Sequence, residues 1–455
     1  MKKLALYAGP ALAVSGGLLL YANGATPAVA WTAGITSLCA LWWIFEPIPI
    51  PATSLIPLAL LPLIGVLTPA EVGESYGNSL ILLLMGGFML STAMERSGVH
   101  RRIALNMVNL FGGGGGRSLV FGFMAASAVL SMWISNTATT LMLLPIALAV
   151  IEQTDNRRLQ LSLLLGIAYA GSVGGLGTPI GTPPNLIFMK VYAETTGIQL
   201  TFTEWMRWGL PIAIIMIPII GLWLTRGLVH KETLELPEPG HWRSEEVRTL
   251  AVFAITALAW ITRREPFGGW SGLLDLPTAN DASVALLAVV VMFLVPNGHG
   301  RKLLDWKTAS SIPWGILILF GAGIAIAKAF GNSGISAAVG EALSGLQHLP
   351  LLLVIGMICL SVTFLTEVTS NTATTALLMP IMAAAAVSSE LDPRLLMVPA
   401  AMTASCAFML PVATGPNAVV FSSDRIMIRE MAREGFVLNL IGVFVVTTVC
   451  YLLFR

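Results

Sequence analysis

Long apolar runs, separated by short polar connections, dominate the chain. A helix that crosses a bilayer core needs about 20 mostly apolar residues. Runs of that length fall at 4–24, 28–46, 52–68, 78–95, 207–226, 247–262, 281–296, 312–330 and 434–454. Two longer runs, 159–195 and 395–424, are each interrupted by Gly and Pro, and counting each as one crossing gives eleven predicted transmembrane helices. The pattern predicts an all-α polytopic membrane protein.

Two further apolar stretches, 118–151 and 347–389, carry a polar centre and are predicted to form re-entrant helical hairpins. The distribution of positive charge favours this reading. With the N-terminus inside and both stretches re-entrant, 18 Lys and Arg fall on cytoplasmic segments and 7 on the opposite side. Cytoplasmic loops normally carry such an excess, and making either stretch a full crossing would remove it. The predicted topology therefore has the N-terminus inside and the C-terminus outside.

Composition supports a membrane protein and excludes several other classes. The chain is 56% hydrophobic and 11% charged, whereas soluble domains carry about 25% charged residues. Its net charge of +1 gives no basic field for nucleic acid, and its five histidines lack metal-ligand spacing. The four cysteines lie in apolar runs without a CxxC motif, so we expect buried thiols and no disulfide. A cleaved signal is the alternative for residues 1–27, but the near-spanning length of this segment favours a retained helix.

The chain contains an internal repeat. The hexamer SNTATT occurs at 135–140 and again at 370–375. A second motif pair follows each copy, TPIGTPPN at 178–185 and LPVATGPN at 410–417, and the offsets are 232–235 residues. We therefore divide the chain into a first helix (1–27), a first repeat (28–230), a cytoplasmic linker (231–246) and a second repeat (247–455).

Each repeat holds five predicted crossings and one hairpin, so the second repeat should be inverted relative to the first. Paired broken helices in inverted repeats indicate a secondary transporter with its site near the midplane.

The polar residues of these segments suit an anion together with a cation. Ser, Thr and Asn inside a membrane often serve only to hold helices together. Here two identical copies, each paired with a Gly/Pro break, favour a binding site instead. The segments hold almost no Arg or Lys, so an anion must bind to amides, hydroxyls and helix N-termini. Two negative charges would be poorly compensated by such donors alone, and a bound cation would compensate them. Paired clusters fit a substrate with an anionic group at each end, or one tetrahedral dianion such as sulfate.

Glu367 is the one acidic residue of these stretches away from their edges, which makes it a functional candidate. Its counterpart in the first repeat is Met132, so it breaks the symmetry of the site. We interpret Glu367 as a structural partner for a backbone or hydroxyl group rather than as a proton relay.

The motifs SMWISNTAT at 131–139 and LTEVTSNTAT at 365–374, with GTPPN and ATGPN at the breaks, resemble those of the divalent anion–sodium symporter family. Bacterial dicarboxylate carriers are the most similar members, and the resemblance covers nearly the whole chain. It implies substrate contacts from Asn136, Thr137, Asn371, Thr372, Thr182, Pro183 and Thr414. It implies a first sodium site at Ser131, Ser135, Asn136 and the Gly181 carbonyl, and a second at Thr366, Thr369, Asn371 and the Ala413 carbonyl.

The resemblance further implies a homodimer in the lipid of the bacterial inner membrane, an elevator movement, Na⁺ as the co-transported ion and no organic cofactor. Gly415 departs from the family pattern, because Pro183 occupies the matching position in the first repeat. This difference puts strict equivalence of the two ends in doubt.

The leading hypothesis is sodium-coupled symport of C4-dicarboxylates such as succinate. A sodium-independent exchanger and a sodium-coupled carrier of citrate or sulfate are the competing hypotheses among transporters. An intramembrane enzyme is disfavoured because these segments carry no nucleophile with a base and no paired carboxylates. A channel is another class of protein with such repeats, and saturable uptake would exclude it.

The predicted topology can be tested by cysteine labelling. A cysteine introduced near Glu390 should react with an impermeant reagent from outside, and one near Arg157 should react from inside. Labelling of both positions from the same face would contradict the inverted repeats.

Overall fold

The computed structural model describes residues 2–112, 115–228, 240–265, 267–338 and 349–455. Within these ranges the regular structure is entirely helical, with no β-strand. Most of the predicted linker 231–246, and the first two residues of the predicted hairpin 347–389, lie outside the described residues.

The first group of helices precedes the first hairpin: α1 (Lys2–Ala22), α2 (Pro27–Phe45), α3 (Ile50–Thr53), α4 (Ile56–Leu63), α5 (Pro69–Tyr76), α6 (Ser79–Ser97) and α7 (Val99–Gly112). The first hairpin and the helices after it follow: α8 (Gly116–Ser131), α9 (Asn136–Ile151), α10 (Arg157–Gly174), the short 3₁₀ helix η1 (Gly175–Gly177), α11 (Pro183–Thr196) and α12 (Phe202–Leu224).

The second half begins with α13 (Ser244–Ile261), α14 (Gly269–Leu273), α15 (Asp281–Leu294), α16 (Trp306–Ala309) and α17 (Trp314–Ser333). It ends with α19 (Leu351–Thr366), α20 (Asn371–Ser388), α21 (Arg394–Ala404), α22 (Gly415–Phe421) and α23 (Ile428–Phe454).

Among the described residues, eight helical segments are long and apolar enough to cross a membrane. They include α1, α2, α12, α17 and α23, which all coincide with predicted runs. The protein is therefore a polytopic all-α membrane protein. The run at 52–68 differs from expectation because it forms the short helices α3 and α4 instead of one long helix. Pro51 and Pro57 lie in the first turns of these helices, where the missing N–H costs nothing, whereas either would disrupt a helix interior.

Both predicted hairpins are helix–turn–helix pairs. The turn between α8 and α9 covers residues 132–135, and the turn between α19 and α20 covers 367–370. Both predicted broken helices are also broken, at 178–182 between η1 and α11 and at 405–414 between α21 and α22. The SNT motifs thus lie at the turns, and the GTPPN and ATGPN motifs lie at the breaks.

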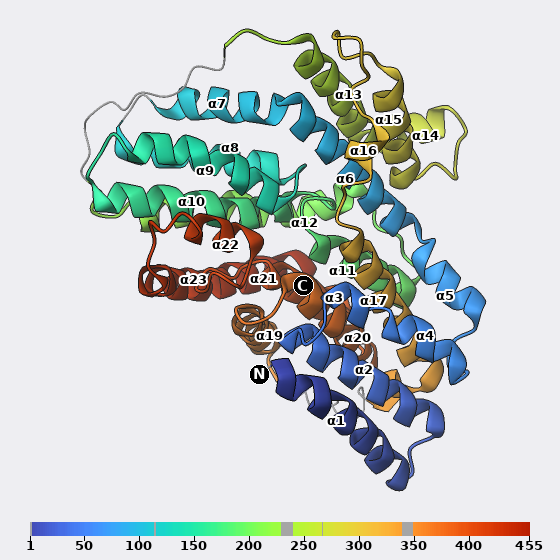
Figure 1. Cartoon of the computed structure of the whole chain (residues 1–455). Coiled ribbons are helices and arrows are strands. Elements are labelled where there is room, and N and C mark those ends of the chain that lie inside the picture. Colours follow the sequence, from blue (N-terminus) through green and yellow to red (C-terminus); the bar gives the residue numbers. More distant parts are fainter. Residues whose placement is uncertain (1, 113–114, 229–239, 266, 339–348) are drawn as a thin grey trace.

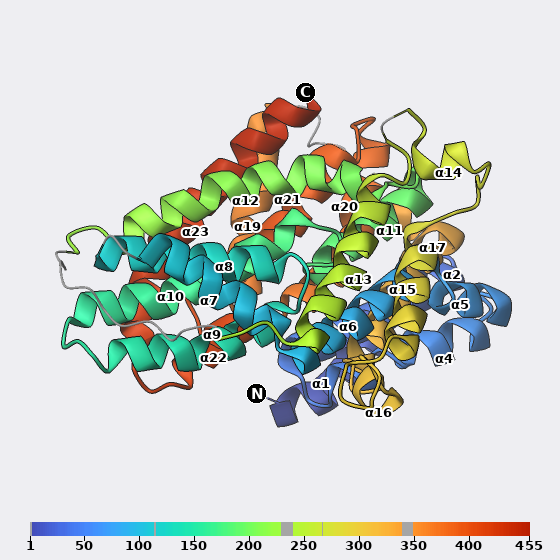
Figure 2. The same cartoon turned by 90° about the horizontal axis from the view of Figure 1, so that it is seen from above.

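The elements of the two halves interleave in space. Figure 1 shows α7, α8, α9 and α10 stacked on one another, with α22 and α23 on the far side of α10, while α13, α15 and α16 pack around α6. Figure 2 shows the same arrangement from above. Helix α9 of the first hairpin packs against α22, and α11 packs against α20 of the second hairpin. Each hairpin therefore contacts the broken helix of the other repeat.

A buried ion pair joins α7 to the start of α13. Arg102 Nε donates to Glu246 Oε2 at 2.9 Å, and the two side chains are 5% and 4% exposed. Arg102 also donates to the Gly240 carbonyl at 2.9 Å. Burial raises the pKa of Glu246, but hydrogen bonds from the Arg243 N–H and from the Arg102 and Arg243 guanidinium groups outweigh burial and hold the pKa below its ordinary value. The pair therefore ties the two halves together on the side of the predicted cytoplasmic linker.

Replacing Glu246 with Gln should destabilise the protein by about 3–5 kcal/mol, because Arg102 would remain buried without a counter-charge. The measurement is thermal unfolding of the purified protein in detergent. Glu265→Gln is the control, since its pair with Arg207 is exposed, with side chains 60% and 50% accessible, and such pairs contribute little. Equal unfolding temperatures for both variants would contradict the assignment.

Candidate functional site

The first break is braced by one buried amide. Asn185, in the first turn of α11, is fully buried. Its Nδ2 donates to the Gly175 carbonyl at 2.9 Å and to the Thr178 carbonyl at 2.8 Å. The Thr178 carbonyl lies outside a helix and also accepts from the Gly181 N–H at 3.3 Å, and polar groups left unsatisfied are costly in a membrane. The Asn of GTPPN therefore stabilises the break from inside.

The second break is braced in the same way. Asn417 is also fully buried. Its Nδ2 donates to the Ala407 and Leu410 carbonyls, both at 3.0 Å. All three residues lie 232 positions after their counterparts in the first break. The internal repeat seen in the sequence is thus repeated in hydrogen-bond geometry.

Three of the four groups expected at the first sodium site lie close together around Gly175. Ser131 Oγ donates to Asn136 Oδ1 at 2.5 Å. A Cβ placed on Gly175 would lie 2.8 Å from Asn136 Oδ1 and 3.2 Å from the Gly181 carbonyl oxygen. The missing side chain at Gly175 allows these oxygens to approach each other. The fourth residue, Ser135, precedes α9 and forms no side-chain cap there.

The groups expected at the second sodium site have other partners. Thr366 Oγ1 donates to the Ala404 carbonyl at 2.9 Å. Thr369 Oγ1 lies 2.5 Å from Thr374 Oγ1. Asn371 Oδ1 accepts from the N–H of Thr372 at 2.7 Å.

Ala413 is 2% exposed. Within the described residues, no hydrogen bond joins Ala413 to Thr366, Thr369 or Asn371. The hydrogen bonds of the Thr366 and Thr369 hydroxyls thus lead to groups outside the expected set, and both sodium sites stay predictions.

The residues expected to contact the substrate lie at or beside the N-termini of four helices. The residues that precede α9, α11 and α20, namely Ser135, Thr182 and Ser370, form no side-chain cap. Only the cap of α22 is closed, because Thr414 Oγ1 accepts from the Asn417 N–H. Helix N-termini attract anions through their free N–H groups and dipole. The residue before the helix thus leaves three N-termini uncapped, although at α20 the Thr372 N–H donates to Asn371 Oδ1 instead.

Thr182 is 1% exposed, and its hydroxyl has no hydrogen-bond partner among the described residues. Pro183 is the first residue of α11. Thr372 and Thr414 are buried, whereas Asn136, Thr137 and Asn371 are half-buried. These positions are compatible with a lining role.

The two halves of the site meet at Gly415. A Cβ at this position would lie 2.0 Å from Thr137 Oγ1, a distance that real Cβ contacts do not show. Gly415 therefore allows the first SNT motif to approach the N-terminus of α22. The departure from the family pattern has a physical reason, because a proline ring could not occupy this space without moving Thr137.

The Glu367 carboxylate is held by four donors. Its Oε1 accepts from the N–H groups of Phe408 at 2.8 Å and Met409 at 2.9 Å. Its Oε2 accepts from the Leu410 N–H at 2.9 Å. Asn439 Nδ2 of α23 donates to Oε1 at 2.7 Å. The interpretation of Glu367 as a partner for backbone groups agrees with this geometry.

Two further polar residues at this break did not emerge from the sequence. Asn439 Oδ1 accepts from the Phe408 N–H at 3.1 Å, in addition to its bond to Glu367. The Tyr169 hydroxyl of α10 donates to the Phe408 carbonyl at 2.6 Å. Each is an isolated polar residue in an apolar run, and that isolation was the available signal.

Aromatic packing distinguishes the two hairpin turns. Trp133 stacks on Phe202, with ring centroids 6.0 Å apart, and meets Phe253 edge-on at 5.4 Å. Its counterpart in the second repeat, Val368, is 60% exposed. The first hairpin turn is therefore packed against α12 and α13, whereas the second turn carries an exposed apolar side chain.

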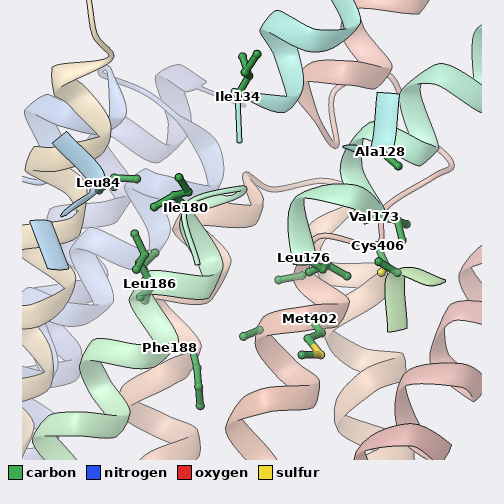
Figure 3. Close-up of a cluster of buried hydrophobic side chains, with 14 of the residues drawn as sticks. Leu84, Ala128, Ile134, Val173, Leu176, Ile180, Leu186, Phe188, Met402 and Cys406 are labelled. Atoms are coloured by element: carbon green, nitrogen blue, oxygen red, sulfur yellow. The ribbon is translucent and has the colours of Figure 1, made fainter. Parts of the chain in front are cut away.

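Apolar side chains enclose the breaks. Figure 3 shows Leu176 of the first break lying near Met402 and Cys406 of the second broken helix, and Ile180 lying near Leu84 of α6. All five side chains are buried. Electrostatic interactions next to such an apolar wall are screened less than they are in water.

Replacing Gly415 with Ala should weaken uptake of the predicted dianion, because the new methyl group must displace Thr137. A shift of about 1 Å at a binding group can cost up to about 100-fold, so we expect KM to rise at least about tenfold. Gly331→Ala is the control, since no atom lies within 4 Å of its Cβ position in α17. An unchanged KM for the Gly415 variant would show that Thr137 is not a substrate contact.

Comparison with known proteins identifies the family. The model of the citrate transporter family matches residues 40–398. The sodium-dependent dicarboxylate transporter SdcS of Staphylococcus saprophyticus is 40% identical over 474 residues, covering 98% of this chain and 90% of the relative. SdcS of Staphylococcus aureus strain USA300 is 40% identical over 442 residues, covering 92% of this chain and 84% of the relative.

Two solved structures share the fold. The YdaH transporter of Alcanivorax borkumensis has a TM-score of 0.60 at 13% identity, covering 86% of this chain and 88% of its own. MtrF of Neisseria gonorrhoeae, described among antimetabolite efflux pumps, has a TM-score of 0.57 at 11% identity, covering 86% of this chain and 83% of its own. The matching family consists of transporters, so the chain is a transport protein and not an enzyme. The resemblance drawn from the SNT motifs is confirmed, and the chain belongs to the divalent anion–sodium symporter family.

Proposed function

We propose that the protein carries C4-dicarboxylates such as succinate across the bacterial inner membrane in symport with sodium. The SdcS relatives, named as sodium-dependent dicarboxylate transporters, support this substrate class. The single observation that carries the proposal is the pair of hairpin turns and braced breaks at Asn185 and Asn417. These provide two matched sets of neutral donors and oxygen ligands within one membrane protein.

The substrate is held without a basic side chain. Asn136 and Thr137 donate to one carboxylate, and Asn371 and Thr372 donate to the other. The residues Thr182, Pro183 and Thr414 line the space between them. The N–H groups at the start of α9 add positive potential, since no side chain caps them. At α20 the Thr372 N–H already donates to Asn371 Oδ1, and α11 begins with two prolines, so these two helices contribute mainly through their dipoles.

Sodium is cargo and also completes the anion site. The first ion is bound by Ser131, Ser135, Asn136 and the Gly181 carbonyl, and the second by Thr366, Thr369, Asn371 and the Ala413 carbonyl. Asn136 and Asn371 belong to both sets, so each can present its amide oxygen to sodium and its amide nitrogen to a carboxylate. Bound sodium thereby orients the donors and supplies the charge that the dianion requires, which makes binding sequential, with sodium first. This chemistry requires no organic cofactor.

Movement of the hairpins and breaks as one body would carry the site across the membrane. The packing of α9 against α22 and of α11 against α20 supports such a body, because it joins each hairpin to the broken helix of the other repeat. We propose an elevator movement of this body within a homodimer. The N-terminus lies inside and the C-terminus outside in this arrangement.

Citrate is the second candidate substrate, because the matching family is described as a citrate transporter family. Sulfate transport and sodium-independent dicarboxylate exchange are competing hypotheses that the same uptake experiment separates.

The function is tested by uptake of radiolabelled succinate into proteoliposomes with an inward sodium gradient. We expect uptake with sodium and almost none with a matched potassium gradient. Equal uptake with both ions would instead support exchange. Uptake of citrate or sulfate without succinate uptake would replace the substrate class.

Asn136→Ala and Asn371→Ala should each reduce sodium-driven succinate uptake by at least about 100-fold, since each removes a group shared by substrate and ion. Asn106→Ala, on an exposed position of α7, is the matched control. Correctly inserted protein should be quantified for every variant. Uptake near the wild-type rate in either site variant would refute the assignment.

A further inference from the structure

The two repeats differ at equivalent positions of the hairpin turn and the break. In the first repeat the position is Met132, and a Cβ on the facing Gly177 would lie 2.9 Å from the Met132 side chain. The Met132 carbonyl accepts from the Thr178 hydroxyl. Turn and break are thus joined by neutral groups. In the second repeat the same positions hold Glu367 and Met409, and a charged group joins them.

The surroundings of Glu367 fit a carboxylate and not a carboxylic acid. The N–H groups of Phe408, Met409 and Leu410 are consecutive along the chain, and all three donate to it. Successive N–H groups of this kind form an anion-binding nest. The fourth partner, Asn439, also donates through its amide nitrogen. A protonated Glu367 would turn an O–H toward one of these donors, so the geometry is satisfied by the negative charge.

This nest determines the direction of the unwound backbone. The N–H and the C=O of a trans peptide point in opposite directions. With their N–H groups bound to Glu367, the peptides at this break direct their carbonyls away from it. The Ala407 carbonyl accordingly reaches Asn417, and the Phe408 carbonyl reaches Tyr169. Glu367 therefore orients the backbone of the second break. The N–H groups face its carboxylate, and the carbonyl groups face other partners.

Glu367 also places a fixed charge beside the second set of cation ligands. It directly follows Thr366 and precedes Thr369 by two residues in the same turn. It is 3% exposed, so its field is weakly screened by solvent. The first set has no acid at the equivalent place, because Met132 occupies it. The two sets of oxygen ligands consequently differ in the electrostatic potential they offer a cation.

We propose that Glu367 is a permanent negative charge beside the second set of cation ligands. It is a positioning residue that fixes the backbone of the second break and makes the second cation cluster bind sodium more strongly than the first. This inference rests on the proposed sodium coupling. It assigns unequal affinities to the two sodium ions, although their ligands come from equivalent motifs of the two repeats.

The decisive variant is Glu367→Gln, which keeps the shape and removes the charge. We expect the sodium concentration for half-maximal succinate uptake to rise about tenfold, while KM for succinate at saturating sodium changes less than about twofold. Glu367→Asp, which restores a carboxylate, should recover most of the sodium affinity. An unchanged sodium requirement in the Gln variant would overturn the inference.

Tyr169→Phe is the matched control for backbone support. It removes a hydrogen bond to the same Phe408 peptide and leaves the charge of Glu367 in place. The half-saturating sodium concentration of this variant should stay within about twofold of wild type. The variant removes a neutral hydroxyl and no charge, and a neutral group contributes little to cation affinity. A shift as large as that of Glu367→Gln would assign the effect to backbone support alone and overturn the electrostatic role.

Met132→Glu provides an independent test if Glu367→Gln does not fold. It transfers the acid to the first repeat, and the half-saturating sodium concentration should fall. An unchanged or raised value would count against the inference. Sodium-dependent thermal stabilisation of purified protein gives the same comparison without transport. Wild-type uptake that ignores sodium would instead refute the proposed function itself.

Discussion

The site depends on one constraint, which is that backbone groups freed inside a membrane must find partners within the protein. Each broken helix frees carbonyls at its first half and N–H groups at its second. Asn185 and Asn417 satisfy the same two carbonyls in each break. The groups that remain after this bracing are the ones available to a ligand. The breaks thus combine stability, provided by the asparagines, with helix N-termini whose dipoles favour an anion.

This arrangement explains how a dianion can be transported without arginine or lysine. A fixed positive charge would hold the anion tightly in every state and would be costly to bury when the site is empty. Neutral donors reduce both problems, but they leave the negative charge incompletely compensated. Mobile cations can supply the missing charge and leave with the substrate. The bound cation and the bound dianion attract each other, so each raises the affinity of the site for the other. This attraction couples their transport.

Sequence patterns predicted the hairpins, the breaks and the repeat because local residue chemistry determines these features. Clustered Gly and Pro interrupt helices at both breaks, whereas single prolines such as Pro145 and Pro380 lie inside helices, and SNT motifs place polar groups at a turn. The run at 52–68 was mispredicted as one helix because hydropathy does not record where Pro51 and Pro57 start new helices. The partners of Tyr169, Asn439 and Trp133 lie far away in sequence, so a local pattern could mark Tyr169 and Asn439 as isolated polar residues but could not reveal what they bind. The sodium ligands, the inversion and the dimer stay predictions.

Small departures from symmetry have a large meaning in a protein built from two copies of one unit. In the predicted inverted arrangement, identical repeats would make the outward and inward states equal in free energy, because exchanging the repeats exchanges the states. Any unequal contact therefore favours one state. Trp133 is packed against Phe202 while its counterpart Val368 is 60% exposed. Glu367 and Gly415 are likewise unmatched across the repeats. If the repeat supplies the two states of the proposed transport cycle, unmatched residues such as these contribute to which state is more populated.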